Sequence, residues 1–68
     1  MITKSIKELS AGDVLIKRDT EESCILKSIV SADNEKLDEF HFEGFVINRR
    51  VLSRFFSVKD NNFLVKNT

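Results

Sequence analysis

Cys24 and His41 are the only residues in the chain that could form a nucleophile–base pair. A cysteine beside a histidine is a common arrangement for covalent catalysis. Cys24 lies in an apolar run, however, and apolar surroundings disfavour the thiolate, which is the reactive form. No second glycine turn or oxyanion-binding segment accompanies it. We therefore expect Cys24 to be a half-buried structural residue and the chain not to be an enzyme.

Carboxylates flank His41 on both sides in the segment 38–43. In an extended strand, Glu39, His41 and Glu43 would share one face, with the two carboxylates about 13 Å apart. That separation is too large for a shared proton or a single metal ion. We expect an acidic, exposed stripe in which His41 is a solvated strand residue. A pH-sensitive contact or a metal ligand is the alternative role for His41.

Metal and phosphate sites have little support in the composition. A structural zinc ion normally takes four Cys or His ligands, and this chain has one residue of each type. A phosphate-binding loop needs several glycines, and Gly12 and Gly44 are the only two in the chain. We therefore expect no metal and no other cofactor.

Arginine and phenylalanine side chains gather in the segment 49–56. Three arginines there could contact a carboxylate or a phosphate, and Phe55 and Phe56 could stack on a base or fill a pocket on a protein. The simplest interpretation is that both phenylalanines belong to the core and the arginines form a solvated rim. A protein contact is the second interpretation, and a nucleic-acid contact is the third.

The charge of the chain is balanced in total but divided along the sequence. There are 11 basic and 11 acidic residues, which argues against a dedicated nucleic-acid-binding protein, since such proteins carry a marked basic excess. Residues 1–40 carry 6 basic and 9 acidic side chains, a net charge of −3, and residues 41–68 carry 5 and 2, a net charge of +3. An acidic patch from 33–43 could meet a basic surface on a partner and steer their encounter.

The length of 68 residues predicts one small domain spanning 1–68. A domain of this size has a thin core and often depends on a disulfide, a metal or a partner subunit. A single cysteine cannot form a bridge within the chain, so an efficiently packed core or a homo-oligomer remains. The charged N-terminal segment lacks the apolar part of a signal peptide, and no apolar run is long enough to cross a membrane. These features predict a cytoplasmic protein without a membrane partner, and the composition would suit a small phage or mobile-element protein.

Capping and turn residues predict a short helical turn before the first strand. Ser5 and Glu8 match a capping box, and Gly12 suits the left-handed conformation that ends such a turn. Apolar residues then predict strands over 14–18 and 23–30, joined by a polar turn. The second strand carries apolar groups on both faces, as expected of a strand that curls inside a barrel.

The third and longest strand is predicted over 37–47, after a polar loop. Its inner face would hold Phe40, Phe42 and Val46, with charged residues on the outer face. Because glycine inside a strand often marks an irregularity, we expect Gly44 to form a bulge or a sharp bend.

The segment that follows has a mixed pattern. Its apolar spacing suits a helical face, and we expect a helical turn over 49–53 that leads into a strand; a strand throughout is the alternative. The Asp and Asn residues at 60–62 predict a tight hairpin between 57–59 and 63–65, because Asn tolerates positive φ. The tail 66–68 is expected to fray.

Five short strands with tight turns predict a mostly β fold, most like a small SH3-like barrel. Closure of the sheet would also hide the edges that a small open sheet exposes. The alternative is an α+β fold in which a helix over 49–57 crosses a small antiparallel sheet.

These observations together predict a non-enzymatic protein-interaction module, an adaptor or an inhibitor, that docks on a larger protein. Its partner-binding residues would be Glu39, His41, Glu43, Arg49, Arg50 and Arg54. One alternative is a small nucleic-acid-binding β-barrel, by analogy with other small barrels, which would use Arg49, Arg50, Arg54 and Lys59. The other alternative is a homo-oligomeric structural protein whose phenylalanines form the subunit interface.

Overall fold

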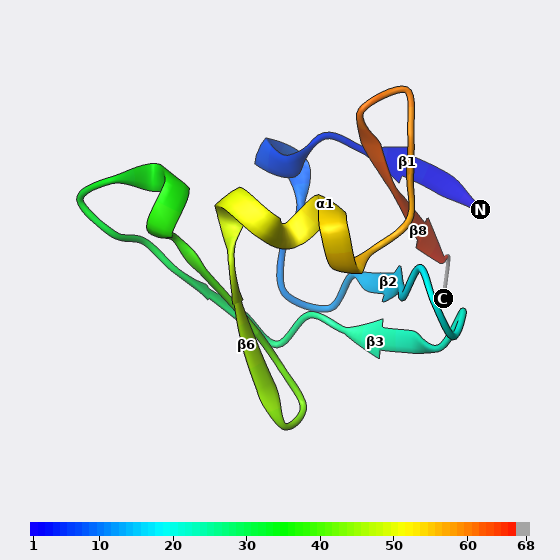
Figure 1. Ribbon diagram of the computed structural model, residues 1–68, viewed down its shortest axis with the longest axis horizontal. Helices are drawn as coiled ribbons and strands as arrows, with labels where there is room; N and C mark the ends of the chain where they lie inside the picture. The colour runs from blue at the N-terminus through cyan, green and yellow to red at the C-terminus, as the bar shows by residue number, and fades with distance from the viewer. Residues whose placement is uncertain (67–68) are drawn as a thin grey trace.

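Short strands and 3₁₀ turns (η) make up residues 1–66, the part of the chain that this computed structural model describes (Figure 1). The elements in chain order are β1 (Ile2–Lys4), η1 (Ile6–Glu8), β2 (Val14–Ile16), β3 (Ser23–Ile25), β4 (Ser28–Val30), η2 (Glu35–Leu37), β5 (Glu39–Phe42), β6 (Phe45–Asn48), η3 (Arg49–Val51), α1 (Leu52–Phe55), β7 (Val58–Lys59) and β8 (Asn62–Lys66). They form two antiparallel sheets. The larger sheet has the order β1–β8–β2–β3, with β7 also paired to β8, and the smaller sheet has the order β4–β5–β6.

The mostly β class is confirmed, with one short α-helix beside the sheets. The strands are shorter and more numerous than the five that we predicted. The SH3-like barrel type stays a prediction. Of the tail 66–68 that we expected to fray, residues 67–68 lie outside the described residues.

The N-terminal helical turn forms as predicted. The Ser5 N–H donates to Glu8 Oε1 at 2.8 Å, which is one half of a capping box, and this hydrogen bond lowers the pKa of Glu8. Gly12 has φ +99°, the left-handed conformation that we expected. Strand β1, before the turn, was not predicted. Three residues are too few to show an alternating pattern, and the partner strand β8 lies at the other end of the chain.

The predicted strand over 23–30 is wrong as a single element. The chain leaves the larger sheet after β3 and joins the smaller sheet at β4. Between them, the fully buried Leu26 donates its N–H to Asp13 O at 2.8 Å, and Lys27 donates its N–H to His41 O at 2.8 Å. Apolar groups on both faces of this segment therefore reflect a crossing between two sheets.

The predicted strand over 37–47 is also wrong as a continuous element. A 3₁₀ turn, η2, occupies its start, and β5 and β6 then form a hairpin that reverses at Glu43 and Gly44. Gly44 has φ +83° and serves this reversal, where we predicted a bulge or bend within one strand. Both features need the conformational freedom of glycine, so the residue type does not distinguish them.

The hairpin also places Val46 on a face that we did not predict. Val46 lies opposite His41, and directly opposite residues share one face of a sheet. Its side chain is 51% exposed, so the prediction of an inner position for Val46 is wrong. Phe40 and Phe42 are buried on the inner face, as predicted.

The predicted helical turn over 49–53 is confirmed, since η3 and α1 follow β6 directly. The expected strand after it is brief: Phe56 pairs with Lys17 in an isolated bridge, and β7 then pairs with β8 in the predicted hairpin. Asp60 and Asn61 have φ +53° and +65°, the two positive values of a type I′ turn.

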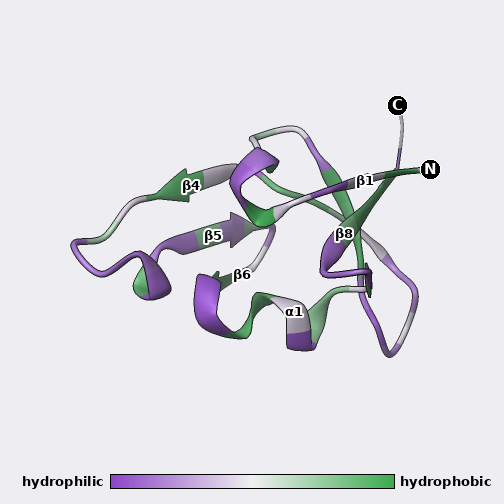
Figure 2. Ribbon diagram, turned by 90° about the horizontal axis from the view of Figure 1, so that it is seen from above, coloured by the Kyte–Doolittle hydropathy of each residue, from purple (hydrophilic) through white to green (hydrophobic). Residues whose placement is uncertain are grey.

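The core lies between the two sheets and under the η3–α1 segment. Figures 1 and 2 show the smaller sheet at one end of the molecule and β1 and β8 at the other, with α1 between them. The buried core cluster draws on β2, β5, β6, α1 and β8 and on three residues between elements. Its members are Leu9, Leu15, Leu26, Phe40, Phe42, Ile47, Leu52, Phe56, Phe63 and Val65.

Candidate functional site

Lys17 lies where three surface hollows meet. It follows Ile16, the last residue of β2, and it pairs with Phe56 and donates its N–H to Glu22 O at 2.9 Å. Its Nζ lies 5.2 Å from the centre of the Phe45 ring, a cation–π distance. The backbone pairing therefore places the start of this side chain, and the ring positions its ammonium group.

The first hollow, which we call the apolar groove, has a volume of about 300 Å³ and separates β6 from the end of α1. Phe56 is fully buried, whereas its neighbour Phe55 is 52% exposed. The expectation that both belong to the core is therefore right for Phe56 and wrong for Phe55. The groove is lined by Lys17, Phe45, Val46, Ile47, Phe55 and Phe56.

The second hollow, which we call the basic hollow, has a volume of about 340 Å³ and shares Lys17 and Phe55 with the apolar groove. Arg18 is held there by a hydrogen bond from its Nε to Phe56 O at 3.1 Å. Within residues 1–66, neither Arg18 nor Arg54 forms an ion pair. Arg18 and Arg54 therefore lie beside one carboxylate, Asp19, while Lys17 Nζ lies within 4.0 Å of Glu22 Oε2. The excess of the two arginines makes the hollow attractive to anions. Its lining residues are Lys17, Arg18, Asp19, Arg54 and Phe55.

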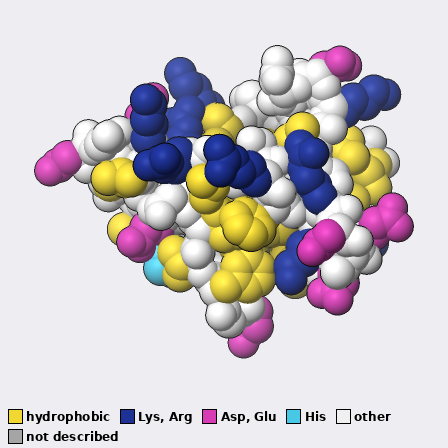
Figure 3. Space-filling model, viewed as in Figure 1, with side chains coloured by type: hydrophobic (Ala, Val, Ile, Leu, Met, Phe, Trp, Pro, Cys, Tyr) yellow, Lys and Arg dark blue, Asp and Glu magenta, His cyan; other side chains and the backbone are white. Residues whose placement is uncertain are grey.

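The charge on this side of the molecule is arranged as a border around apolar surface. Figure 3 shows Lys and Arg side chains in a row across the region of η3 and α1, with hydrophobic side chains exposed directly below the row. Acidic side chains lie mainly toward the margins of the same view. Exposed apolar surface with a polar rim commonly marks an interaction site.

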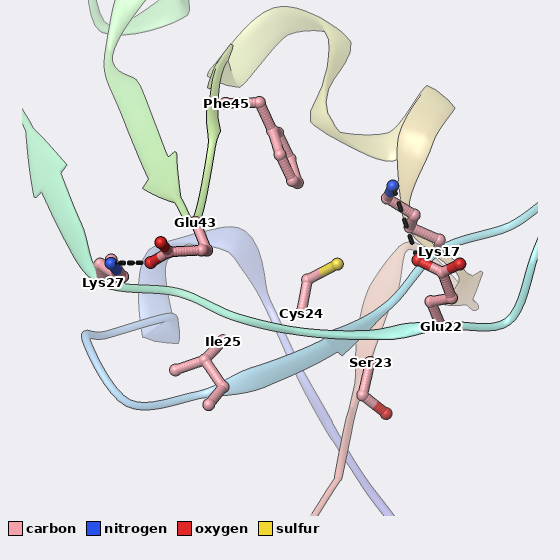
Figure 4. A pocket seen from close by; sticks show the side chains of 8 residues that line it. All are labelled: Lys17, Glu22, Ser23, Cys24, Ile25, Lys27, Glu43 and Phe45. Carbon is pink, nitrogen blue, oxygen red and sulfur yellow. Dashed lines mark ion pairs between the residues drawn. The ribbon is translucent and has the colours of Figure 1, made fainter.

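The third hollow has a volume of about 580 Å³ and contains Cys24 (Figure 4). The Cys24 side chain points toward Phe45, whereas Ser23 and Ile25 point to the opposite side of β3. Cys24 is half-buried, as we predicted. His41 is not among the lining residues, so the structure does not bring the candidate pair, Cys24 and His41, into one hollow.

The charges that border this third hollow neutralise one another. Lys27 forms an ion pair with Glu43, and Lys17 Nζ lies 4.0 Å from Glu22 Oε2. The hydrogen bond from Lys27 and the positive charge of Lys27 lower the pKa of Glu43. This hollow therefore lacks the excess positive charge of the basic hollow.

His41 lies on the outer face of the smaller sheet, opposite Ser28 and Val46. Its Nε2 lies 2.9 Å from Glu39 Oε1, in the same strand. Glu43 is in the hairpin turn, so the acidic stripe that we predicted along one strand is not formed. Within the described chain, no three His, Cys, Asp or Glu side chains lie close enough together to hold a metal ion.

The structure separates the three arginines that we singled out. Arg49 Nη1 lies 3.2 Å from Glu35 Oε2, and the side chain is mostly buried. Arg50 and Arg54 are exposed and form no ion pair within residues 1–66. Lys59, in β7, lines none of the three hollows. Only Arg54 of these residues belongs to the basic hollow.

Most of the acidic segment 33–43 is engaged inside the chain. Its carboxylates contact Arg49, Lys27 and His41, and Asp38 Oδ1 accepts the Ala32 N–H at 2.8 Å. Acidic side chains of this segment therefore neutralise some of the basic side chains of the same chain. Around η3, α1 and the end of β2, three arginines have no acidic contact within residues 1–66: Arg18, Arg50 and Arg54.

Sequence reasoning missed Lys17 and Arg18. We assigned them to opposite faces of a strand over 14–18, because adjacent strand residues point in opposite directions. The strand ends at Ile16, and contacts with Phe56 hold both residues beside the end of α1. The signal that could have found them is the change from apolar to charged residues after Ile16, which marks the end of the buried strand.

Comparisons with known protein families, with curated proteins and with solved structures found no match for this chain. No helix in residues 1–66 is long and apolar enough to span a membrane. We therefore infer function from the apolar groove and the basic hollow themselves.

Proposed function

We propose that this chain is a non-enzymatic protein-interaction module, an adaptor or an inhibitor, that docks on a larger protein through the apolar groove and the basic hollow. The observation that carries the proposal is Phe55, whose ring is 52% exposed where the two hollows meet. An aromatic ring beside an arginine is the composition of a protein–protein hot spot. Burial of this ring on a partner would stabilise the complex through the hydrophobic effect.

The charge around Phe55 indicates the kind of surface that the partner presents. Arg18 and Arg54 have no acidic contact within residues 1–66, and Arg50 is exposed nearby in sequence on η3. A partner surface with carboxylates around an apolar centre would match this arrangement. Such complementarity mainly raises the association rate and suppresses wrong partners, while the apolar contact determines how long the complex lasts.

The residues assigned to binding change accordingly. Arg50 and Arg54 stay in the proposed surface, and Lys17, Arg18 and Phe55 join them. The other predicted binding residues contact side chains of this chain, so we assign them to the stability of the fold: Glu39, His41, Glu43 and Arg49.

A pull-down from cell lysate with the tagged protein, with and without nuclease and read by mass spectrometry, tests this proposal. We expect one stoichiometric protein that survives nuclease. Phe55→Ala should weaken its binding about thirtyfold, because truncation of a hot-spot residue costs about 2 kcal/mol. Arg54→Glu should slow association.

Lys59→Glu is the matched control, because it makes the same charge change in β7, outside both hollows. It should bind the partner as the unmodified protein does. The proposal is wrong if Phe55→Ala and Arg54→Glu bind normally while Lys59→Glu loses the partner.

Nucleic-acid binding is the second candidate, and the proximity of Phe55 to Arg54 favours it, since a ring can stack on a base while an arginine contacts phosphate. Binding would then fall steeply with salt. Both Lys59→Glu and Arg54→Glu would then weaken nucleic-acid binding. Absence of binding to single-stranded DNA and RNA at low salt would exclude this candidate.

Several expectations from the sequence stay part of the proposal. They are an SH3-like barrel type, a cytoplasmic location, the absence of a cofactor and an origin in a phage or mobile element. The homo-oligomer alternative is tested by the solution mass at micromolar concentration, where a monomer would exclude it.

A further inference from the structure

The edge of β6 that borders the apolar groove has no strand partner. Within residues 1–66, β6 pairs with β5 alone. Hydrogen-bonded and non-hydrogen-bonded pairs alternate along an antiparallel hairpin, and Phe42–Phe45, which flank the two-residue turn, form the first bonded pair. His41–Val46 is therefore a non-bonded pair. The N–H and C=O of Val46, and the N–H of Asn48, point away from β5.

This edge lacks three of the features that normally protect an edge strand, although β6 is itself short, at four residues. Natural edges are blunted by charged residues, by proline or by a bulge, and β6 contains none of these over Phe45–Asn48. A hollow of about 300 Å³ runs beside it. By contrast, the edge strand β4 lines none of the three hollows. The third hollow lies beside the edge strand β3, but the charged side chains that border it form ion pairs with one another.

We propose that the partner adds an extended segment to β6 as a fourth strand of the smaller sheet, and that this segment presents both apolar and acidic side chains on the face that meets the groove. The inference rests on the proposed function and specifies how its partner docks. Main-chain hydrogen bonds to Val46 and Asn48 would supply affinity, as in other cases of strand addition. Alternate side chains of a strand point to opposite faces. One set would enter the apolar groove against Phe45 and Phe55.

The charges beside the groove act on the same set of side chains. Arg18 and Arg54 lie beside a single carboxylate, Asp19, in the adjoining basic hollow and form no ion pair within residues 1–66. A side chain of this set that lies beyond the apolar ones would bring a carboxylate toward these arginines. A second copy of this chain fits less well, because β6 carries no acidic residue to offer. Nucleic acid fits less well, because it has no peptide groups to continue the ladder.

The test is a selection of linear peptides of about twelve residues from a random phage-displayed library, using the intact protein as bait. Enriched peptides should carry apolar residues at alternate positions, with Asp or Glu next in the same alternating set. Amide hydrogen exchange, followed by NMR, should then slow at Val46 and Asn48 when a selected peptide binds. Exchange at Phe45 and Ile47 should not change, because their amides already bond to β5.

Two variants at one position separate the backbone from the side chain. Val46→Pro removes the outward N–H and leaves the bonds to β5 in place, since proline is tolerated where an edge N–H faces solvent. We expect it to weaken peptide binding about tenfold. Val46→Ala keeps the N–H and should bind within about threefold of the unmodified protein. If Val46→Pro does not fold, amide hydrogen exchange at Val46 in the unmodified protein still tests whether the peptide adds as a strand.

Each other outcome overturns the inference in a recognisable way. Peptides that bind without slowing exchange at Val46 would disprove strand addition, and the proposed function would survive if Phe55→Ala still abolished their binding. Enriched peptides without acidic residues would disprove the charge assignment. Protection of Val46 that needs no peptide and rises with protein concentration would assign the edge to a second copy. Failure to enrich any peptide, together with no protein partner in the pull-down, would end both proposals.

Discussion

Asp13 connects three segments of the N-terminal half of the chain. Its Oδ1 accepts a hydrogen bond from Lys4 Nζ at 2.9 Å, its Oδ2 accepts one from the Ser10 N–H at 2.9 Å, and its backbone C=O accepts the Leu26 N–H at 2.8 Å. Burial opposes ionisation of this carboxyl, but the hydrogen bonds from Lys4 and Ser10 outweigh it and lower the pKa of Asp13. The Asp13 carboxylate thus ties β1 to the turn before β2, and its backbone C=O ties that turn to the crossing after β3.

The lowered pKa of Asp13 predicts an acid-sensitive contribution to stability. A group whose pKa is depressed by folding contributes fully above its unfolded pKa, near 3.8, and the contribution is lost as pH falls through the folded pKa. Asp13→Asn should therefore lower the free energy of unfolding by roughly 1 kcal/mol at pH 7. The difference should shrink as pH falls below 3.8. Urea denaturation across this pH range measures it.

Asp33→Asn serves as the control, since Asp33 is exposed and has no side-chain hydrogen bond or ion pair within residues 1–66. Its stability should follow that of the unmodified protein at every pH. A constant difference between Asp13→Asn and the unmodified protein down to acid pH would contradict this account.

At the scale of elements, turns with positive φ decide where the strands of this small fold begin and end. Gly44 has φ +83° between β5 and β6, and Asp60 and Asn61 have φ +53° and +65° between β7 and β8. The second of these turns was recognisable in the sequence because Asp and Asn together are typical of tight hairpins. The first was not, because one glycine inside an apolar run suits a bulge as well as a turn.

Gly44→Ala should destabilise the β5–β6 hairpin through the backbone alone. A Cβ at this position would meet no atom within 4 Å, so only the left-handed conformation opposes it, at about 1–2 kcal/mol. Gly44→Asn should lose less stability, because asparagine enters this region more readily. Urea denaturation midpoints of the two variants provide the comparison. Equal losses would show that the turn does not require the left-handed conformation.

At the scale of the whole molecule, the two sheets are joined by a row of aromatic rings. The Phe42 ring stacks on Phe45 at 5.0 Å and on Phe56 at 4.8 Å between centroids. Phe42 and Phe45 belong to the smaller sheet, and Phe56 pairs with Lys17 at the end of β2 in the larger one. This row of rings is therefore one of the contacts that join the two sheets.

The neighbours Phe55 and Phe56 provide a matched test of this arrangement. Phe56 is fully buried, so Phe56→Ala should cost about 3–5 kcal/mol, a large share of the 5–15 kcal/mol typical of a domain. Phe55→Ala should change stability by about 0.5 kcal/mol or less, because its side chain is exposed. Thermal and urea denaturation measure the stability of both variants. Similar losses of stability in the two would contradict the assignment of Phe55 to the surface.

Local signals in the sequence determined a substantial part of the fold. The mostly β class, the capped turn over Ser5–Glu8, the helical turn over 49–53 and the hairpin at 60–62 all depend on residues within a few positions of one another. Such contacts form at little entropic cost, so their patterns can be read directly. The sequence also identified the arginine and phenylalanine segment from which part of the proposed binding surface comes.

Only the tertiary structure decided which residues form that surface. Phe55 and Phe56 are adjacent and identical in type, and their different burial depends on Lys17 pairing with Phe56 across the fold. The same pairing brings Lys17 and Arg18 beside Arg54, which lies far from them in sequence. Long-range pairing of this kind leaves no periodic pattern, because it follows from how the sheets pack together. For the same reason, the open edge of β6 was visible only after the hairpin at Gly44 had shown where the strand turns.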